Sequence, residues 1–213
     1  MVTVNTISVK SIISKSKIPG YDYAINPYVG CPHRCVYCYA EYMRRFTGHT
    51  EPWGQFLDVK SCPVPLKPAQ LFHTHVMLSS VTDPYNPFEE KYGLTRQLLK
   101  QLAYCQAYVH IHTKSPLVLR DIDLLATMPG CEVIFSIATT DENFRQLAEP
   151  GASADLARVT PTRHIHCHYG SSVYARYYRL EKSVNTSANV CRTSIIRYLK
   201  YAPRLPDKNT PFY

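Results

Sequence analysis

Three cysteines within eight residues are the feature that most constrains this chain. Cys31, Cys35 and Cys38 follow a C-x3-C-x2-C spacing on a short stretch rich in turn-forming residues. Three thiolates can hold three irons of a [4Fe-4S] cube and leave the fourth iron without a protein ligand, whereas electron-transfer clusters normally have four protein ligands. An iron with a vacant position can bind a small chelator and act on it chemically. The spacing therefore predicts a catalytic iron–sulfur site.

The alternative interpretation of the same motif is a zinc knuckle. Zinc takes four tetrahedral ligands, and His33, His49 or Cys62 could complete the set. No second C-x2-C or H-x3-H pair follows at finger spacing, which favours the cluster. A disulfide framework is disfavoured, because residues 1–17 lack the apolar region of a signal peptide and the eight cysteines are irregularly spaced. We therefore expect a protein of the reducing cytoplasm.

Composition predicts a globular protein with an uneven distribution of charge. The 213 residues suffice for one domain with a sizeable core. No apolar run approaches the length of a membrane span, so we expect no membrane partner. Residues 1–151 carry 14 basic and 13 acidic side chains, whereas residues 152–213 carry 10 and 3, out of a net charge of +8. The basic character therefore belongs to the C-terminal segment, where it favours nucleic-acid affinity.

The middle of the chain alternates between two hydrophobic patterns. Apolar runs predict buried strands over 71–80, 109–113 and 131–137. Between and after them, helices are predicted over 94–104, from Pro116 onward, and over 142–148, where Asp141 is a good N-cap. Strands that alternate with helices at this spacing form parallel βα units. The sequence therefore predicts an α/β fold with its functional groups at the C-terminal ends of the strands.

The two ends of the chain give weaker patterns. We expect residues 1–20 to be an extended lead-in ended by a Pro-Gly turn, residues 23–25 to form a short strand, and residues 39–46 to start a helix. Residues 153–213 show no clear βα unit. They contain an alternation of His164, His166 and His168, interpreted as a chance cluster, and a short basic helix is predicted at 193–201.

Several stretches together resemble the spore photoproduct lyase-like family of the radical S-adenosylmethionine (SAM) superfamily, also called DNA repair photolyase-like. The superfamily motif is C-x3-C-x-aromatic-C, with Tyr37 as the aromatic residue. The matching stretches follow in the same order over about residues 5–153; they are NPYVGC (26–31), CVYCYA (35–40), VTDPYNP (81–87) with residues 89–96, TKSPLVLRD (113–121) and EPGA (149–152). The VTDPYNP and TKSPLVLRD stretches make the resemblance specific to the family.

The resemblance implies a fold and a chemistry. The fold would be a partial TIM-like barrel with about four βα units of an expected six. A [4Fe-4S] cluster would bind SAM and receive an electron from a donor such as flavodoxin or ferredoxin. SAM cleavage would then give a 5′-deoxyadenosyl radical that abstracts hydrogen from a substrate, in a lyase-like reaction. A nucleic-acid partner is suggested by the family and by the basic segment.

The resemblance also implies roles for individual side chains. The metal ligands would be Cys31, Cys35 and Cys38, and the residues facing SAM would be Tyr37 at the adenine, Thr82 and Asp83 beyond the second strand, Lys114 at the carboxylate, and Ser136 as a hydrogen-bonding group. Two alternatives from the residues alone stay open. The 83–87 stretch also reads as an ordinary strand-to-helix turn, and Ser136 as a hydrogen-bonded core hydroxyl.

Two departures from the family pattern affect the expected function. Ser80 stands where spore photoproduct lyase has a cysteine that donates hydrogen, and a hydroxyl is a far poorer hydrogen-atom donor than a thiol. After residue 152 the family pattern is replaced by the basic segment, for which a frameshifted or truncated gene is the leading hypothesis. We therefore expect a radical SAM core over 1–152 and an irregular basic segment over 153–213. The alternatives are a catalytically inactive cluster-binding remnant, or a zinc-dependent nucleic-acid-binding module using Arg44 and Arg45.

Overall fold

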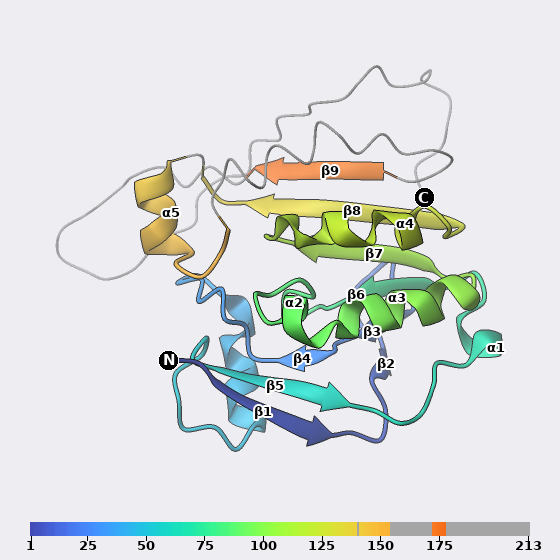
Figure 1. Cartoon of the computed structure of the whole chain (residues 1–213), viewed down its shortest axis with the longest axis horizontal. Coiled ribbons are helices and arrows are strands. Elements are labelled where there is room, and N and C mark those ends of the chain that lie inside the picture. The colour runs from blue at the N-terminus through green and yellow to red at the C-terminus, as the bar shows by residue number, and fades with distance from the viewer. Residues whose placement is uncertain (140, 154–171, 178–213) are drawn as a thin grey trace.

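The computed structural model describes residues 1–139 and 141–153 and the backbone of residues 172–177 (Figure 1). A six-stranded sheet, in the order β2-β3-β6-β7-β8-β9, forms its centre. The strands from β3 to β9 run parallel, and β2 is antiparallel to β3. The strand bounds are β2 Ile13–Lys15, β3 Tyr23–Ile25, β6 His75–Leu78, β7 Tyr108–Thr113, β8 Gly130–Ile137 and β9 Ser172–Tyr177.

A second, three-stranded sheet has the order β1-β5-β4. Here β1 (Thr3–Ser8) is parallel to β5 (Phe56–Ser61), and β4 (Tyr28–Val29) is antiparallel to β5. This sheet has its own small core of Tyr28, Leu57 and Val59. It holds the residues that lead into the cysteine motif.

The main core lies between the six-stranded sheet and the helices. Helices α3 and α4 cover one face of the sheet in Figure 1. Alternate residues of the strands, such as Val109 and Ile111 of β7, point into this core beside Leu98, Leu99 and Leu102 of α3. Each such side chain contributes about 1.5–3 kcal/mol when it is fully buried. The helix bounds are η1 Tyr39–Phe46, α1 Pro68–Leu71, α2 Glu89–Tyr92, α3 Leu94–Tyr104, η2 Pro116–Asp121, α4 Ile122–Leu125 and α5 Glu142–Ala148, with η denoting 3-10 helices.

The predicted α/β fold with a partial barrel is confirmed, and several elements fall where they were expected. Helices α3 and α5 and strand β3 have the predicted bounds. The Asp141 carboxylate caps α5 by accepting hydrogen bonds from the backbone N–H groups of Asn143 and Phe144. This cap satisfies two donors that a helix start otherwise leaves without partners.

Other elements differ from the prediction. The lead-in of residues 1–20 contains two strands, β1 and β2, because β1 finds a distant partner in β5. Strand β5 itself was not predicted. The helix expected from Pro116 is a 3-10 turn followed by the short α4. Strand β9 extends the parallel sheet inside the segment where no βα unit was expected. The histidine alternation and the predicted helix at 193–201 lie outside the described residues.

The C-terminal ends of the parallel strands lie at the edge where α5 packs, on the left of Figure 1. This is the edge at which a parallel sheet presents its functional side chains. Among the described residues, no helix is long and apolar enough to cross a membrane.

Candidate iron–sulfur and SAM site

The cysteine loop, residues 31–38, follows β4 through a glycine that no other residue can replace without strain. Gly30 has φ +84°, and a Cβ there would stand 2.3 Å from the carbonyl oxygen of Phe56. The loop then turns on backbone hydrogen bonds from Arg34 N to Cys31 O (3.2 Å) and from Cys38 N to Cys35 O (3.1 Å). Cys31 is buried, Cys35 and Cys38 are half-buried, and all three thiols are free. Three thiols are therefore available on one compact loop.

The end of α5 holds this loop in place. We call residues 148–152 the brace. Val36 N donates to Ala148 O and Gly151 N donates to His33 O, each over 2.9 Å. Gly151 packs so closely that a Cβ there would lie 2.0 Å from the carbonyl oxygen of Pro32. The brace and the loop are more than a hundred residues apart in sequence, so tertiary structure alone creates this contact.

A buried arginine fixes the shape of the brace. The Arg145 side chain is 6 % exposed. Its Nη1 donates to the carbonyl oxygens of Glu149 and Ala152, each over 2.9 Å, while Nε and Nη2 contact the Glu142 carboxylate. These bonds add side-chain donors to two carbonyl groups beyond the end of α5, where a helix leaves carbonyls without intrahelical partners. The guanidinium thus shapes the segment that contacts the cysteines.

Lys114, Tyr37 and Glu149 meet beside the loop. Lys114 Nζ lies 2.8 Å from Glu149 Oε1, 3.2 Å from the Tyr37 hydroxyl and 3.5 Å from the Ser136 carbonyl oxygen. The Tyr37 hydroxyl donates to Glu149, whose side chain is fully buried. The Lys114 ammonium is also 5.6 Å from the Tyr37 ring centroid. Three of the residues expected at SAM, namely Tyr37, Lys114 and Ser136, are therefore brought together, with Glu149 as a fourth member.

Asp83 joins the strand ends to the loop. Its carboxylate accepts hydrogen bonds from Thr113 Oγ1 (2.7 Å), Lys114 N (2.7 Å) and Tyr85 N (2.9 Å). On the loop side, His33 Nδ1 lies 3.3 Å from Asp83 Oδ2. Asp83 is 8 % exposed, so its oxygens are largely occupied by protein groups. In this structure Asp83 ties β6, β7 and the cysteine loop together.

The remaining predicted residues are also engaged. Thr82 is buried, and its hydroxyl donates to the Tyr28 carbonyl oxygen over 3.3 Å. Ser136 is half-buried on β8, and its carbonyl is the one that faces Lys114. Ser80, at the position of the missing thiol, is held by Asn26: its backbone N–H donates to Asn26 Oδ1 over 2.8 Å.

The environment of the thiols fits a positively charged metal group. Burial and the nearby Asp83 carboxylate raise the pKa of Cys31 to about 12. Burial also raises the pKa of Cys35 to about 12. Without metal, these thiols stay protonated at neutral pH, and a metal group would replace their protons. The donor set of three soft sulfur ligands suits an iron–sulfur cluster.

A site for a single metal ion needs a tighter arrangement of ligands than a cluster site. Over the described residues, no group of three or more His, Cys, Asp or Glu side chains is arranged to hold a metal ion. The ligands of a four-iron cube stand farther apart than those of one ion, because each binds a different iron.

Two of the stretches that carry the family resemblance build a buried charge network below the site. Glu89 and Asp121 are both fully buried. Arg120 Nη2 contacts Glu89 Oε1 (2.7 Å) and Asp121 Oδ2 (2.8 Å), and Arg96 Nη1 contacts Asp121 Oδ1 (2.7 Å). Buried carboxylates need such partners, since an uncompensated charge in the core is costly. These residues therefore support the strand ends and do not face the cysteines.

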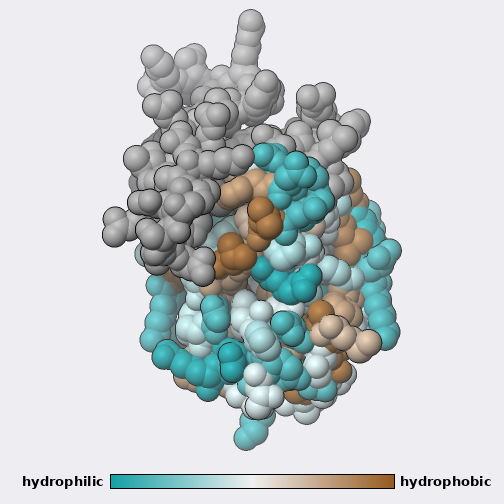
Figure 2. Space-filling model, turned by 90° about the vertical axis from the view of Figure 1, so that its left-hand side faces the viewer, coloured by the Kyte–Doolittle hydropathy of each residue, from teal (hydrophilic) through white to brown (hydrophobic). Residues whose placement is uncertain are grey.

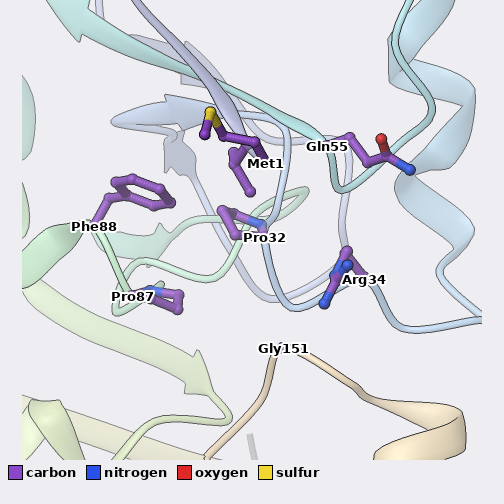
Figure 3. A pocket seen from close by; sticks show the side chains of 8 residues that line it. Met1, Pro32, Arg34, Gln55, Pro87, Phe88 and Gly151 are labelled. Carbon is purple, nitrogen blue, oxygen red and sulfur yellow. The ribbon is translucent and has the colours of Figure 1, made fainter.

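A pocket of about 410 Å³ lies behind the cysteine loop (Figure 3). Pro32, Arg34 and Gly151 line it together with Met1 and Phe88. Its lining contains none of the five residues expected at SAM. The face that carries the strand ends shows hydrophobic groups interspersed with hydrophilic ones (Figure 2). The pocket is thus distinct from the place where Tyr37 and Lys114 meet.

The sequence analysis missed the residues that connect the loop to the rest of the fold. Glu149, Gly151 and Arg145 were assigned no role toward the cysteines, and His33 was considered only as a possible fourth zinc ligand. The one available signal was the EPGA stretch, which was recognised as part of the resemblance without a structural reason.

The chain combines a partial parallel α/β barrel with three free cysteines beside the C-terminal ends of its strands. The sequence matches the radical SAM superfamily over residues 25–158, and the chain belongs to that superfamily. The resemblance to this superfamily, which the cysteine motif first indicated, is thereby confirmed.

The chain is also similar to individual proteins. It is 36 % identical over 153 residues to an uncharacterized protein of Methanocaldococcus jannaschii, covering 72 % of this chain and 58 % of that protein. It is 32 % identical over 157 residues to an uncharacterized protein of Acidianus two-tailed virus, covering 66 % of this chain and 50 % of that protein. The chain thus spans between half and three-fifths of the length of these relatives.

The fold matches that of spore photoproduct lyase. A cysteine-to-serine variant of that enzyme superposes with a TM-score of 0.57 at 18 % identity, covering 80 % of this chain and 50 % of the other. Another variant, solved with bound AdoMet and a dinucleoside spore photoproduct, has a TM-score of 0.52 at 18 % identity and covers 76 % and 46 %. This likeness concerns the fold.

Proposed function

We propose that this protein is a radical SAM enzyme that holds a [4Fe-4S] cluster through Cys31, Cys35 and Cys38. The observation that carries the proposal is the clamping of a loop with three free thiols between the strand ends and the brace. When bound, the cluster and SAM supply one-electron cleavage of the sulfonium, which yields a 5′-deoxyadenosyl radical. Superfamily membership supports this chemistry.

The chain's own residues would orient SAM and exclude water. Tyr37 presents an exposed aromatic ring next to Cys38, suited to contact with adenine. Lys114 lies at the end of β7 and carries the cation for a carboxylate, although Glu149 holds it in this structure. SAM binding would therefore have to share Lys114 with Glu149. The proposed SAM site would also be shaped by side chains near two strand ends. Thr82 and Asp83 follow β6, and Ser136 lies near the end of β8.

The proposed substrate class is nucleic acid. Spore photoproduct lyase, which is similar in fold, binds a dinucleoside spore photoproduct in two of its solved structures, and this supports a nucleic-acid substrate here. Ser80 offers an O–H bond in place of a thiol. Its backbone is held on both sides, because its N–H donates to Asn26 Oδ1 and its carbonyl oxygen accepts from the Tyr39 hydroxyl. Reversal of a thymine dimer with hydrogen return from this position is therefore disfavoured. A flavodoxin or ferredoxin would supply the electron, in the reducing cytoplasm that keeps the thiols free.

The test is anaerobic reconstitution of the full chain with iron and sulfide, followed by reduction with dithionite in the presence of SAM. We expect about four irons per chain, a brown chromophore, and 5′-deoxyadenosine as product. Cys35→Ala should abolish the product, whereas Cys62→Ala, a half-buried cysteine outside the loop, should leave it unchanged.

Two results would overturn the proposal and identify the alternative. A stable cluster without any SAM cleavage would indicate the inactive remnant. One tightly bound zinc with no cluster, together with salt-sensitive nucleic-acid binding, would indicate the zinc module.

A further inference from the structure

We infer that the exposed side of the cysteine loop and of η1 is the docking face for an acidic one-electron donor protein. This inference rests on the proposed function, because it names the partner of the same site. We define the docking face by the side chains Val36, Tyr39, Tyr42, Arg44, Arg45 and Phe46.

The docking face is unusually apolar for a surface. Val36 is 67 % exposed, Tyr39 69 % and Phe46 66 %, and Tyr42 is also exposed. They lie within eleven consecutive residues, and the rings of Tyr42 and Phe46 meet edge to face with centroids 6.4 Å apart. Contiguous exposed aromatic groups are uncommon on a monomer and mark interaction sites. Tyrosine and arginine are also the residues enriched where protein partners bind tightly.

Two arginines give the docking face its charge. Arg44 and Arg45 occupy the last turn of η1, where Glu41 is the single acidic residue of the helix. The Arg45 guanidinium lies 4.8 Å from the Phe46 ring centroid and 5.7 Å from that of Tyr42, and Arg44 Nη2 donates to the Thr50 carbonyl oxygen over 3.3 Å. Arg45 is therefore held beside the aromatic rings, and Arg44 is held by the backbone that follows η1. An acidic partner complements them.

The position of the docking face favours an electron donor over a nucleic acid. Val36 stands between Cys35 and Cys38 in sequence, and Cys38 directly precedes η1. A partner seated here touches the loop that would hold the cluster. A nucleic acid needs a basic groove that follows its phosphates, whereas here two arginines border an apolar centre, as at protein interfaces. In this transfer the reduced donor loses one electron, and the cluster gains it.

The experiment separates docking from chemistry. The variant Arg44→Glu/Arg45→Glu reverses the charge of the docking face and leaves the cysteines and the brace intact. The matched control is Lys91→Glu/Lys100→Glu, which changes the net charge by the same amount at two exposed lysines of α2 and α3. Binding of oxidised bacterial flavodoxin to the reconstituted full chain is measured by calorimetry at low and high salt. SAM cleavage is measured with flavodoxin hydroquinone and, separately, with dithionite.

We expect the docking-face variant to bind flavodoxin at least tenfold more weakly than the control. Its flavodoxin-driven SAM cleavage should fall by a similar factor, while cleavage with dithionite stays unchanged, since dithionite needs no docking. High salt should reduce the difference between variant and control.

Equal flavodoxin binding by the variant and the control would overturn the inference. So would a loss of affinity for a single-stranded oligonucleotide with flavodoxin binding unchanged, which would assign the face to nucleic acid. A failure of the proposed function looks different, because the unaltered protein would then give no 5′-deoxyadenosine with dithionite either.

Discussion

At the scale of single residues, a few contacts decide where the cysteine loop lies. Gly151 allows the brace to touch the loop backbone, and the Lys114–Glu149 pair joins β7 to the brace. Neither contact involves a cysteine proposed to bind the cluster, although both lie next to the loop that carries those cysteines. Substitution at these positions therefore tests how the fold supports the site.

Gly151→Ala should displace the cysteine loop. The new Cβ would lie 2.0 Å from the Pro32 carbonyl oxygen, so backbone has to move. Overpacking of this kind costs about 1–3 kcal/mol. We expect a lower Tm and less iron bound after reconstitution. Gly48→Ala is the control, because its Cβ would meet nothing within 4 Å. Equal iron content in both variants would contradict the proposed contact.

Lys114→Met should destabilise the fold more than the double variant Lys114→Met/Glu149→Gln. The single change leaves the fully buried Glu149 carboxylate without its cation, which costs about 3–5 kcal/mol in buried pairs. The double change removes both charges. Urea unfolding of the four proteins of this cycle gives the coupling energy. Additive losses would show that the pair is not coupled.

At the scale of elements, the N-terminal sheet fixes the entrance to the cysteine loop. His49, in the segment before β5, lies 2.8 Å from Asp58 Oδ1 of that strand and 3.1 Å from Glu51 Oε2. Its ring stacks on Phe56 with centroids 4.0 Å apart. Burial disfavours the charged imidazole, but the hydrogen bonds to Asp58 and Glu51 outweigh burial and raise the pKa of His49.

This raised pKa predicts a pH dependence of stability. A group whose pKa is higher in the folded state stabilises that state fully below its unfolded pKa, which is about 6.5 for histidine. The stabilisation is lost as the pH rises through the folded pKa. We therefore expect the Tm of the natural protein to fall relative to that of His49→Gln as the pH rises above about 6.5. Parallel Tm curves for the two proteins would exclude this contribution.

At the scale of the whole molecule, β9 pairs with the outer edge of β8, which would otherwise have no partner on that side. Strand β8 pairs with β7 on one side and with β9 on the other. An unpaired parallel strand presents its backbone N–H and C=O groups to other chains. The boundary expected at residue 152 therefore falls between two neighbouring strands of one sheet.

Deletion of residues 154–213 should make the chain associate. The edge of β8 loses its β9 partner, and apolar residues of β8 such as Val133 and Phe135 lie next to it. We expect concentration-dependent oligomers in sedimentation experiments, whereas the full chain stays smaller under the same conditions. A monomeric, fully folded shortened protein would show that residues 1–153 form an independent domain.

The local features of this protein could be predicted from neighbouring residues in the sequence. The cysteine spacing depends on eight neighbouring residues, and the α3 helix depends on a repeat of leucines, so both could be read without a fold. The Asp141 cap is local in the same way. Strand β1 was missed because its pattern is half-exposed and its pairing with β5 joins residues some fifty positions apart.

The contacts that hold the site together join residues far apart in sequence, so they depend on the tertiary structure. Tyr37 meets Glu149 across 112 positions and Lys114 across 77. Gly151 reaches the cysteine loop because α5 ends beside it. Hydrophobic periodicity reports which face of an element is buried, but it does not report which distant element packs there. The proposed ligands could therefore be predicted from the sequence, whereas the brace that positions them could be found only from the fold.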